Sequence, residues 1–121
     1  MHVLETSALI DVMKSTRRGK AVMERVGKED AATTAICVHE TLVGEPTWAP
    51  LLGSTSIEII PFDFAAAEAS AQVRAQLQRM GKMVEPLDIL IAGICIAHDH
   101  TLVTCDKGYL RIKGLRTVFV E

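Results

Sequence analysis

Two acidic residues directly follow short apolar segments that are typical of β-strands. Glu5 follows the letters HVL at 2–4, and Asp106 follows TLVTC at 101–105. In open parallel sheets, ligands bind outside the carboxyl ends of the strands, where the strand order reverses. If these two strands are neighbours, their two carboxylates face each other at that edge of the sheet.

Two further acids lie in helical patterns that should begin at the same edge. Asp88 lies in the first turn of PLDILIAGICIAHDH at 86–100, and Glu40 lies in ICVHETLVG at 36–44. Clustered carboxylates repel one another, so a site built from all four needs protons or a cation. Hard divalent ions such as Mg²⁺ or Mn²⁺ prefer oxygen ligands. Such ions align a water and a phosphoryl oxygen for in-line displacement, which makes phosphoryl chemistry the leading interpretation.

Each of these acids also has a purely structural interpretation. Asp88 complements a helix dipole in its first-turn position, and Asp106 suits a turn that includes Gly108. Glu40 suits a solvated helix face, and Glu5 suits a structural role at its strand end. The four residues together are harder to explain in this way than any one of them alone.

The rest of the chain alternates between strand and helix patterns. The predicted strands are 2–5, 31–35, 56–62, 101–105 and 117–121, and the predicted helices are 7–15, 20–28, 36–44, 64–81 and 86–100. This alternation predicts an α/β fold with a mainly parallel central sheet. Pro86 is suited to the first position of the last helix, which is apolar almost all round and should be buried. Residues 44–54 contain two prolines and two glycines and should hold only a short helix or loop.

Length and composition predict a single domain over residues 1–121 that is soluble and cytoplasmic. The chain is 49% hydrophobic and 23% charged, and aromatic residues make up only 4%, which disfavours stacking platforms for single-stranded nucleic acid. Its three cysteines form no CxxC pair, which disfavours a disulfide framework or a zinc site and suits a reducing compartment. The longest apolar stretch, 89–97, is too short to span a bilayer, and no signal-peptide pattern precedes it.

The net charge of −2 conceals an uneven distribution. All 13 Lys and Arg residues lie in two blocks, 14–28 and 74–116, while residues 29–73 contain seven acids and no base. Basic patches beside an acidic pocket suit a phosphate-bearing partner, although a solvated surface explains them equally well. The candidates for phosphate contacts are Arg74, Arg79, Lys82, Lys107, Arg111, Lys113 and Arg116.

Three parts of the chain resemble PIN domains, and most closely the VapC ribonuclease toxins of type II toxin–antitoxin systems. They are LETSALIDVM at 4–13, Glu40, and PLDILIAGICIAHDHTLVTCDKGYLRIKGL at 86–115. The resemblance implies a three-layer PIN-like fold with a central sheet of about five strands. It also implies a Mg²⁺- or Mn²⁺-dependent endoribonuclease that cuts RNA, forms a homodimer and is silenced by a VapB-like antitoxin.

Carried over by position, the resemblance assigns the acidic site to Glu5, Glu40, Asp88 and Asp106. Thr6 and Thr104 match the hydroxyl positions that orient such acids, although Thr6 is equally suited to cap a helix. The sequence around Ser7 invites a nucleophile interpretation, but no histidine is placed to act as its base, and Ser7 itself suits a helix cap.

The chain departs from the family pattern at Glu5, where the family nearly always has Asp. The longer side chain keeps the charge and the ligand atoms, but Mg²⁺ demands near-ideal octahedral geometry, and a displacement of about 1 Å can cost on the order of 100-fold in rate. Three interpretations follow: a shifted but working site, an inactive natural relative, and an engineered substitution. The alternative functions are therefore a module that binds an antitoxin or RNA without cutting, and an RNA-processing PIN nuclease outside any toxin pair.

Two other departures concern the loops. Residues 44–54 are shorter than the helical stretch that family members often carry there. A glycine tends to end the last helix in the family, whereas this chain has HDHT at 98–101, so Asp99 or His100 must take the turn. Asp tolerates the left-handed backbone conformation better than most residues.

Overall fold

The computed structural model describes all of residues 1–121 and is built around one five-stranded sheet. The strands are β1 (His2–Leu4), β2 (Ala31–Thr34), β3 (Glu58–Ile60), β4 (Thr101–Thr104) and β5 (Thr117–Phe119). They lie in the order β3-β2-β1-β4-β5, and every neighbouring pair is parallel. The predicted α/β fold with a parallel central sheet is confirmed.

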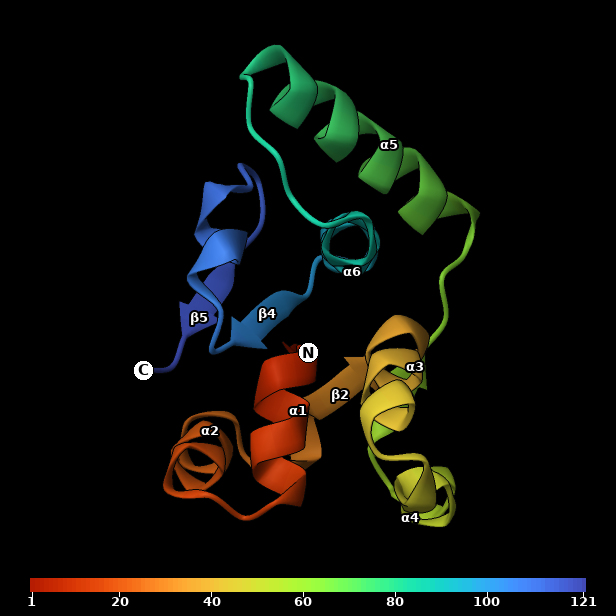
Figure 1. Cartoon of the computed structure of the whole chain (residues 1–121), viewed down its shortest axis with the longest axis vertical. Coiled ribbons are helices and arrows are strands. Elements are labelled where there is room, and N and C mark those ends of the chain that lie inside the picture. The colour runs from red at the N-terminus through yellow and green to blue at the C-terminus, as the bar shows by residue number, and fades with distance from the viewer.

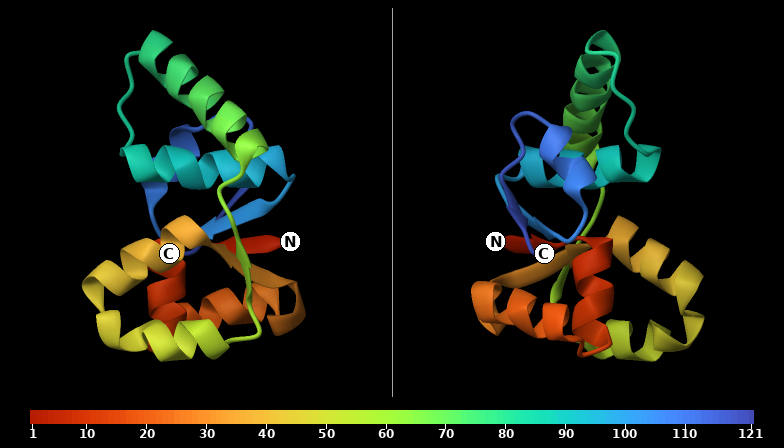
Figure 2. Two further views of the ribbon diagram at one scale, coloured as in Figure 1. Left: turned by 90° about the vertical axis from the view of Figure 1, so that its right-hand side faces the viewer. Right: turned by 60° about the vertical axis from the view of Figure 1, so that its left-hand side comes forward.

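Helices cover both faces of this sheet (Figures 1 and 2). The α-helices are α1 (Thr6–Met13), α2 (Arg17–Val26), α3 (Ala35–Gly44), α4 (Ala49–Ser54), α5 (Phe64–Arg79) and α6 (Pro86–Ala97). Three short 3₁₀ helices are η1 (Lys28–Asp30), η2 (Pro46–Trp48) and η3 (Lys107–Arg111). Figure 2 shows α5 and α6 on one side of the sheet and α1 to α4 on the other. None of the helices is both long and apolar enough to cross a membrane.

The strand order reverses between β1 and β4, which lie side by side at the centre of the sheet. His2 pairs with Thr101 and Leu4 with Val103, so the two strands end at the same edge. The Glu5 amide continues the ladder by donating to the Val103 carbonyl at 2.9 Å. The residues that follow these two strands are therefore neighbours, as the sequence predicted, and they stand at a topological switch point where parallel sheets bind ligands.

The core consists of apolar residues from the central strands and from α6. Ile91 and Ile94 of α6 are fully buried, and so are Val3 of β1 and Leu102 of β4. Helix α5 lies against α6 so closely that a Cβ atom on Gly93 would stand 2.6 Å from the Ser70 Cβ. The predicted burial of α6 is confirmed, and this packing holds the start of α6 in place at the edge of the sheet.

Several element boundaries differ from the sequence prediction by one to three residues, and the differences at β3 and α2 have clear local causes. Strand β3 covers only 58–60 rather than 56–62, because Pro61 has no N–H to donate to the ladder and ends the strand. Helix α2 begins at Arg17, three residues early, because the Thr16 side chain accepts a bond from the Gly19 amide and caps it. The short helices η2 and α4 within residues 44–54 match the prediction, and Asp99 takes the left-handed turn after α6 with φ of 58°.

Candidate functional site

Glu5 both ends β1 and caps α1. Its Oε1 atom accepts from the Ser7 amide at 3.1 Å, from the Ser7 hydroxyl, and from the Thr104 hydroxyl at 2.6 Å. Glu5 is only 5% exposed, and burial raises its pKa, while the hydrogen bonds from Ser7 and Thr104 oppose that rise and the nearby Asp88 charge adds to it. The prediction that Ser7 caps the helix is wrong, because the longer Glu5 side chain folds back and takes that role.

Two hydroxyls connect Glu5 to the residues that follow β4. The Ser7 Oγ accepts from the Cys105 amide at 3.0 Å, and the Thr104 Oγ1 accepts from the Asp106 amide at 3.0 Å. Each hydroxyl thus donates to Glu5 and accepts from the neighbouring strand end. The position of the Glu5 carboxylate is therefore set by contacts between two distant parts of the chain.

Asp88 and Glu40 are also held by single hydroxyl donors. The Tyr109 hydroxyl donates to Asp88 Oδ1 at 2.8 Å, and the Thr6 hydroxyl donates to Glu40 Oε1 at 2.7 Å. Burial raises the pKa of Asp88, the Tyr109 hydrogen bond lowers it, and the charges of Glu40, Asp106 and Glu85 raise it further. Thr6 lies inside α1 rather than at its cap, and its hydroxyl orients Glu40, one of the four acids that the resemblance assigned to the site.

Asp106 is the most exposed of the four acids. Its Oδ1 atom accepts from the Gly108 amide at 2.8 Å, so it also makes the turn that was its alternative interpretation. This bond engages only one of the two carboxylate oxygens. Asp106 can therefore form this turn with one oxygen and still bind a ligand with the other.

The four carboxylates line one pocket of about 510 Å³ and share a bonding pattern. Each uses one oxygen to accept hydrogen bonds from protein donors, and its other oxygen has no protein donor. The predicted convergence of four acids from distant parts of the chain is therefore present. The remaining lining residues are Thr6, Ser7, Ile10, Glu85, Pro86 and Leu87.

This set of oxygen atoms suits a hard divalent cation. No three acidic, histidine or cysteine residues converge closely enough to hold one metal ion by themselves. Mg²⁺ in proteins keeps several waters and is bound through one or two carboxylates, so the pocket meets that requirement without a closed cage. The raised pKa values of Glu5 and Asp88 indicate that the pocket carries more negative charge than its environment favours.

Sequence reasoning missed three features of this pocket. Glu85 is a fifth acid in its lining, and its signal was an acid directly before the Pro86 that starts α6. Tyr109 supports Asp88 from η3, and Ser7 links Glu5 to β4. The last two contacts depend on tertiary packing, which local sequence patterns do not report.

The other candidate residues have ordinary structural partners or lie apart from the pocket. His98 pairs with Asp63 at 2.7 Å and His2 pairs with Asp30, and neither histidine lines the pocket of the four acids. Trp48 is half-buried and packs against the hydrophobic core. Arg116 pairs with Asp99 at 2.6 Å, whereas Lys107 and Arg111 line a second pocket beside the acids.

A family model described as PIN domain matches residues 49–115, which is more than half of the chain. The chain belongs to the PIN domain family. The matched part of this PIN domain includes Thr104, Asp88 and Asp106, whereas Glu5 and Glu40 precede it. The two acids outside the match are thus placed in the pocket by the fold rather than by the family model.

Individual relatives agree with this assignment. The tRNA(fMet)-specific endonuclease VapC of Shigella flexneri is 39% identical over 62 residues, which cover 50% of this chain and 47% of that protein. The match thus spans about half the length of that relative. Among solved structures, VapBC2 from Rickettsia felis bound to a promoter DNA fragment has a TM-score of 0.85 at 24% identity and covers 99% of this PIN domain and 98% of that chain. VapBC-5 from Mycobacterium tuberculosis, a member of the VapBC family of toxin–antitoxin systems, has a TM-score of 0.78 at 23% identity and covers 98% of both chains. The predicted PIN-like fold is confirmed.

Proposed function

We propose that this PIN domain is a divalent-metal-dependent endoribonuclease that acts in the cytoplasm as the toxin of a VapBC-type pair. The observation that carries the proposal is the bonding pattern of the four acids that line this pocket, each with one oxygen held by protein donors and one without a protein donor. The Shigella flexneri relative is an endonuclease and the Mycobacterium tuberculosis structure belongs to a family of toxin–antitoxin systems, and both support the same function.

In the proposed mechanism, Glu5, Asp88 and Asp106 would hold one or two Mg²⁺ or Mn²⁺ ions, each bound through one or two of these carboxylates and otherwise by waters. The bound ion would lower the pKa of a water and stabilise negative charge on the leaving oxygen. Glu40 acts as a direct or water-mediated ligand or as a proton acceptor, and Thr6 keeps its carboxylate oriented. In-line attack by water on an RNA phosphodiester leaves 5′-phosphate and 3′-hydroxyl ends.

The glutamate at position 5 is compatible with activity in this proposal. The longer side chain folds back to cap α1, which accommodates its additional methylene. The carboxylate still accepts hydrogen bonds from Ser7 and Thr104. A carboxylate fixed by three donors loses little further freedom when it binds an ion, which favours a working site over an inactive one.

The test is cleavage of a structured RNA mixture in Mg²⁺, in Mn²⁺ and in EDTA. We expect the chain to cut in either metal but not in EDTA, and Asp88→Asn to cut at least about 100-fold more slowly. Asp99→Asn is the matched control, because Asp99 is an exposed acid outside the pocket and asparagine accepts its left-handed backbone. We expect this control to cut normally.

Each other outcome points to a different function. If only Glu5→Asp cuts RNA, the fold is that of a nuclease and the glutamate at position 5 makes it inactive. No cleavage by any version would favour a module that binds antitoxin or RNA without cutting. Product ends with 2′,3′-cyclic phosphates would contradict hydrolysis by water, because such ends result from attack by the RNA 2′-hydroxyl.

The toxin role and the partners have separate tests. Expression should arrest growth, a small gene directly upstream should relieve the arrest, and Asp88→Asn should abolish it. Arrest without relief by any neighbour would favour an RNA-processing nuclease instead. In this proposal an Arg or Lys side chain of the VapB-like antitoxin pairs with the free carboxylate oxygens. The PIN domain also forms a homodimer in this proposal, and light scattering would measure its mass in solution.

A further inference from the structure

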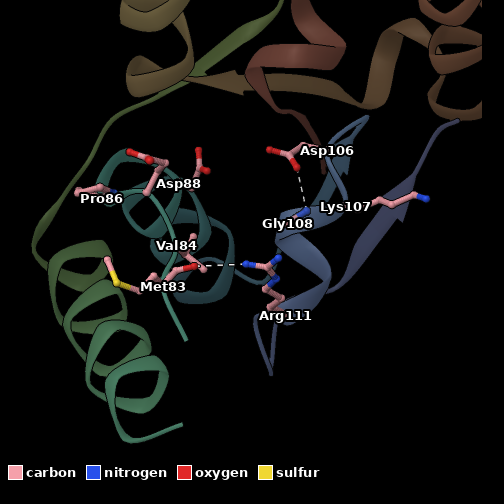
Figure 3. Close-up of a pocket in the computed structure, with 9 residues that line it drawn as sticks. Met83, Val84, Pro86, Asp88, Asp106, Lys107, Gly108 and Arg111 are labelled. Carbon is pink, nitrogen blue, oxygen red and sulfur yellow. Dashed lines mark hydrogen bonds between the residues drawn. The ribbon is translucent and has the colours of Figure 1, made fainter. Parts of the chain in front are cut away.

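A second pocket, of about 630 Å³, adjoins the pocket of the four acids. The two pockets share Glu85, Pro86, Asp88 and Asp106. The walls that belong to the second pocket alone are Met83 and Val84 on one side and Lys107, Gly108 and Arg111 of η3 on the other. Figure 3 shows Asp88 and Asp106 at one end of this pocket and Arg111 further along it. The second pocket thus places basic groups directly beside the acids.

Arg111 has no carboxylate partner. Its Nη1 atom donates only to the Met83 carbonyl, at 3.4 Å, which is long for a hydrogen bond. By contrast, Arg18 pairs with Asp11 at 2.7 Å and Arg116 pairs with Asp99 at 2.6 Å. A guanidinium carries five N–H donors, so nearly all the bonding capacity of Arg111 remains for a ligand.

The short helix η3 holds Arg111 in a defined place. Tyr109, in the middle of η3, is 1% exposed and its hydroxyl is bonded to Asp88, and the next residue after η3, Ile112, is also buried. The backbone that carries Arg111 is therefore anchored to the same acid that the proposed reaction uses. In Figure 3 the Arg111 side chain reaches across the pocket towards Met83.

Lys107 adds positive charge to the second pocket, but unlike Arg111 it makes no hydrogen bond across it. It has no ion-pair partner, and its Nζ atom stands 5.9 Å from the centroid of the Phe119 ring. Figure 3 shows its side chain directed away from Arg111. Arg111 is therefore the cation that spans the pocket.

We propose that Arg111 binds the RNA phosphate adjacent to the one that is cut. This inference rests on the proposed function, which places the scissile phosphate at the four acids. A strand bound there continues into the adjoining pocket, where Glu85, Asp88 and Asp106 would repel its next phosphate without a compensating cation. The planar fork of an arginine side chain matches two phosphate oxygens at once, which suits this position better than a lysine ammonium does.

The binding test uses a fluorescently labelled short single-stranded RNA, with Ca²⁺ in place of Mg²⁺ and a gel to verify that the RNA is intact. We expect Arg111→Gln to weaken binding by about tenfold and to reduce the slope of log K against log salt by about 0.7, the value for one phosphate contact on a single strand. Lys28→Gln is the charge-matched control, because Lys28 is exposed, is not among the candidates for phosphate contacts and lines neither pocket. It should change neither quantity.

Two results would overturn the proposal. If Arg111→Gln binds as tightly as the unaltered chain, Arg111 contacts no phosphate. If Lys28→Gln loses as much affinity as Arg111→Gln, the effect is general attraction between a basic surface and RNA. Equal thermal stability of both variants and the unaltered chain verifies that folding is not the cause.

Cleavage kinetics separate this inference from the proposed function. With an active protein, Arg111→Gln should raise KM about tenfold and leave kcat nearly unchanged, because the contact is the same in the bound substrate and in the transition state. If no metal supports cleavage but Arg111→Gln still weakens RNA binding, the nuclease function fails and the phosphate contact stands. If cleavage occurs and Arg111→Gln leaves KM unchanged, the nuclease function stands and the phosphate contact fails.

Discussion

The two strand ends at the centre of the sheet present their acids in different ways. Glu5, after β1, is buried and is held by three donors from Ser7 and Thr104. Asp106, after β4, is exposed and is held by a single amide from its own turn. The first carboxylate is thus fixed by tertiary structure and the second by local structure. The site accordingly combines a rigid side with an open side, and the open side is the one that continues into the pocket of Arg111.

The largest effect should come from Thr104, because its hydroxyl joins the two sides. It donates to Glu5 and accepts from the Asp106 amide, and it is fully buried. Thr104→Val removes one of the three donors to Glu5 and leaves the Asp106 amide without its acceptor, so we expect a loss of about 1–3 kcal/mol in unfolding free energy and of about 10–100-fold in cleavage rate. Urea titration and RNA cleavage measure the two effects.

The matched control at this position is Thr104→Ser, which keeps the hydroxyl and removes only the methyl group. It should cost about 1 kcal/mol and keep most of the activity. Equal activity of the valine and unaltered proteins would contradict the claim that this hydroxyl positions Glu5.

A smaller effect should follow from Tyr109→Phe, which removes the one donor that holds Asp88 and keeps the ring in the core. We expect cleavage to fall about tenfold and stability by about 1 kcal/mol, because the half-buried Asp88 carboxylate can then rotate. Mn²⁺ binding, followed by calorimetry, gives a second readout. In the Asp88→Asn background the same tyrosine change should leave Mn²⁺ affinity unaltered, and any further loss there would show that Tyr109 acts through another group.

The smallest effect concerns the pH dependence of stability without metal. Burial raises the pKa of Glu5 and Asp88, so the folded state binds their protons more tightly than the unfolded state does. The associated stability is fully present below the unfolded pKa values, near 4.5 for Glu5 and 3.8 for Asp88, and is lost as the pH rises through the folded values. In thermal melts in EDTA, the melting temperature of Glu5→Gln should therefore rise relative to that of the unaltered protein as the pH increases towards 7.

Asp99→Asn serves as the comparison in these melts, since it removes an exposed acid outside the pocket. Its melting temperature should keep a constant offset from that of the unaltered chain across the same pH range. Added Mg²⁺ should raise the melting temperature of the unaltered chain most at the high end of that range, where Glu5 and Asp88 are charged.

Much of this site could be predicted from the sequence because strand ends obey a simple geometric rule. Parallel strands end at one edge, so Glu5 and Asp106 were expected together once β1 and β4 were taken as neighbours. The missing glycine after α6 likewise predicted a left-handed turn at Asp99 or His100, and Asp99 takes it. These are features that local patterns and strand polarity determine.

The side-chain contacts could not be predicted in that way. Ser7 was expected to cap α1, yet Glu5 reached the cap position and Ser7 instead linked it to the Cys105 amide. Tyr109 reaches Asp88 across 21 positions of sequence, and Arg111 meets Met83 only because η3 and the segment before α6 converge. Such pairs depend on how whole elements pack, and residue spacing alone does not predict them.

The pairing of β1 with β4 has a consequence for how the protein is made. Strand β1 takes the central place in the sheet, yet β4, its partner across the switch point, is synthesised long after it. Until translation has passed residue 106, the chain holds Glu5 and Glu40 without Asp106 and without the Thr104 hydroxyl that fixes Glu5. Pairing between such distant segments is also slow to form. Before that point the nascent polypeptide has no assembled acidic centre, so any hydrolytic activity begins only after β4 and Asp106 have been synthesised.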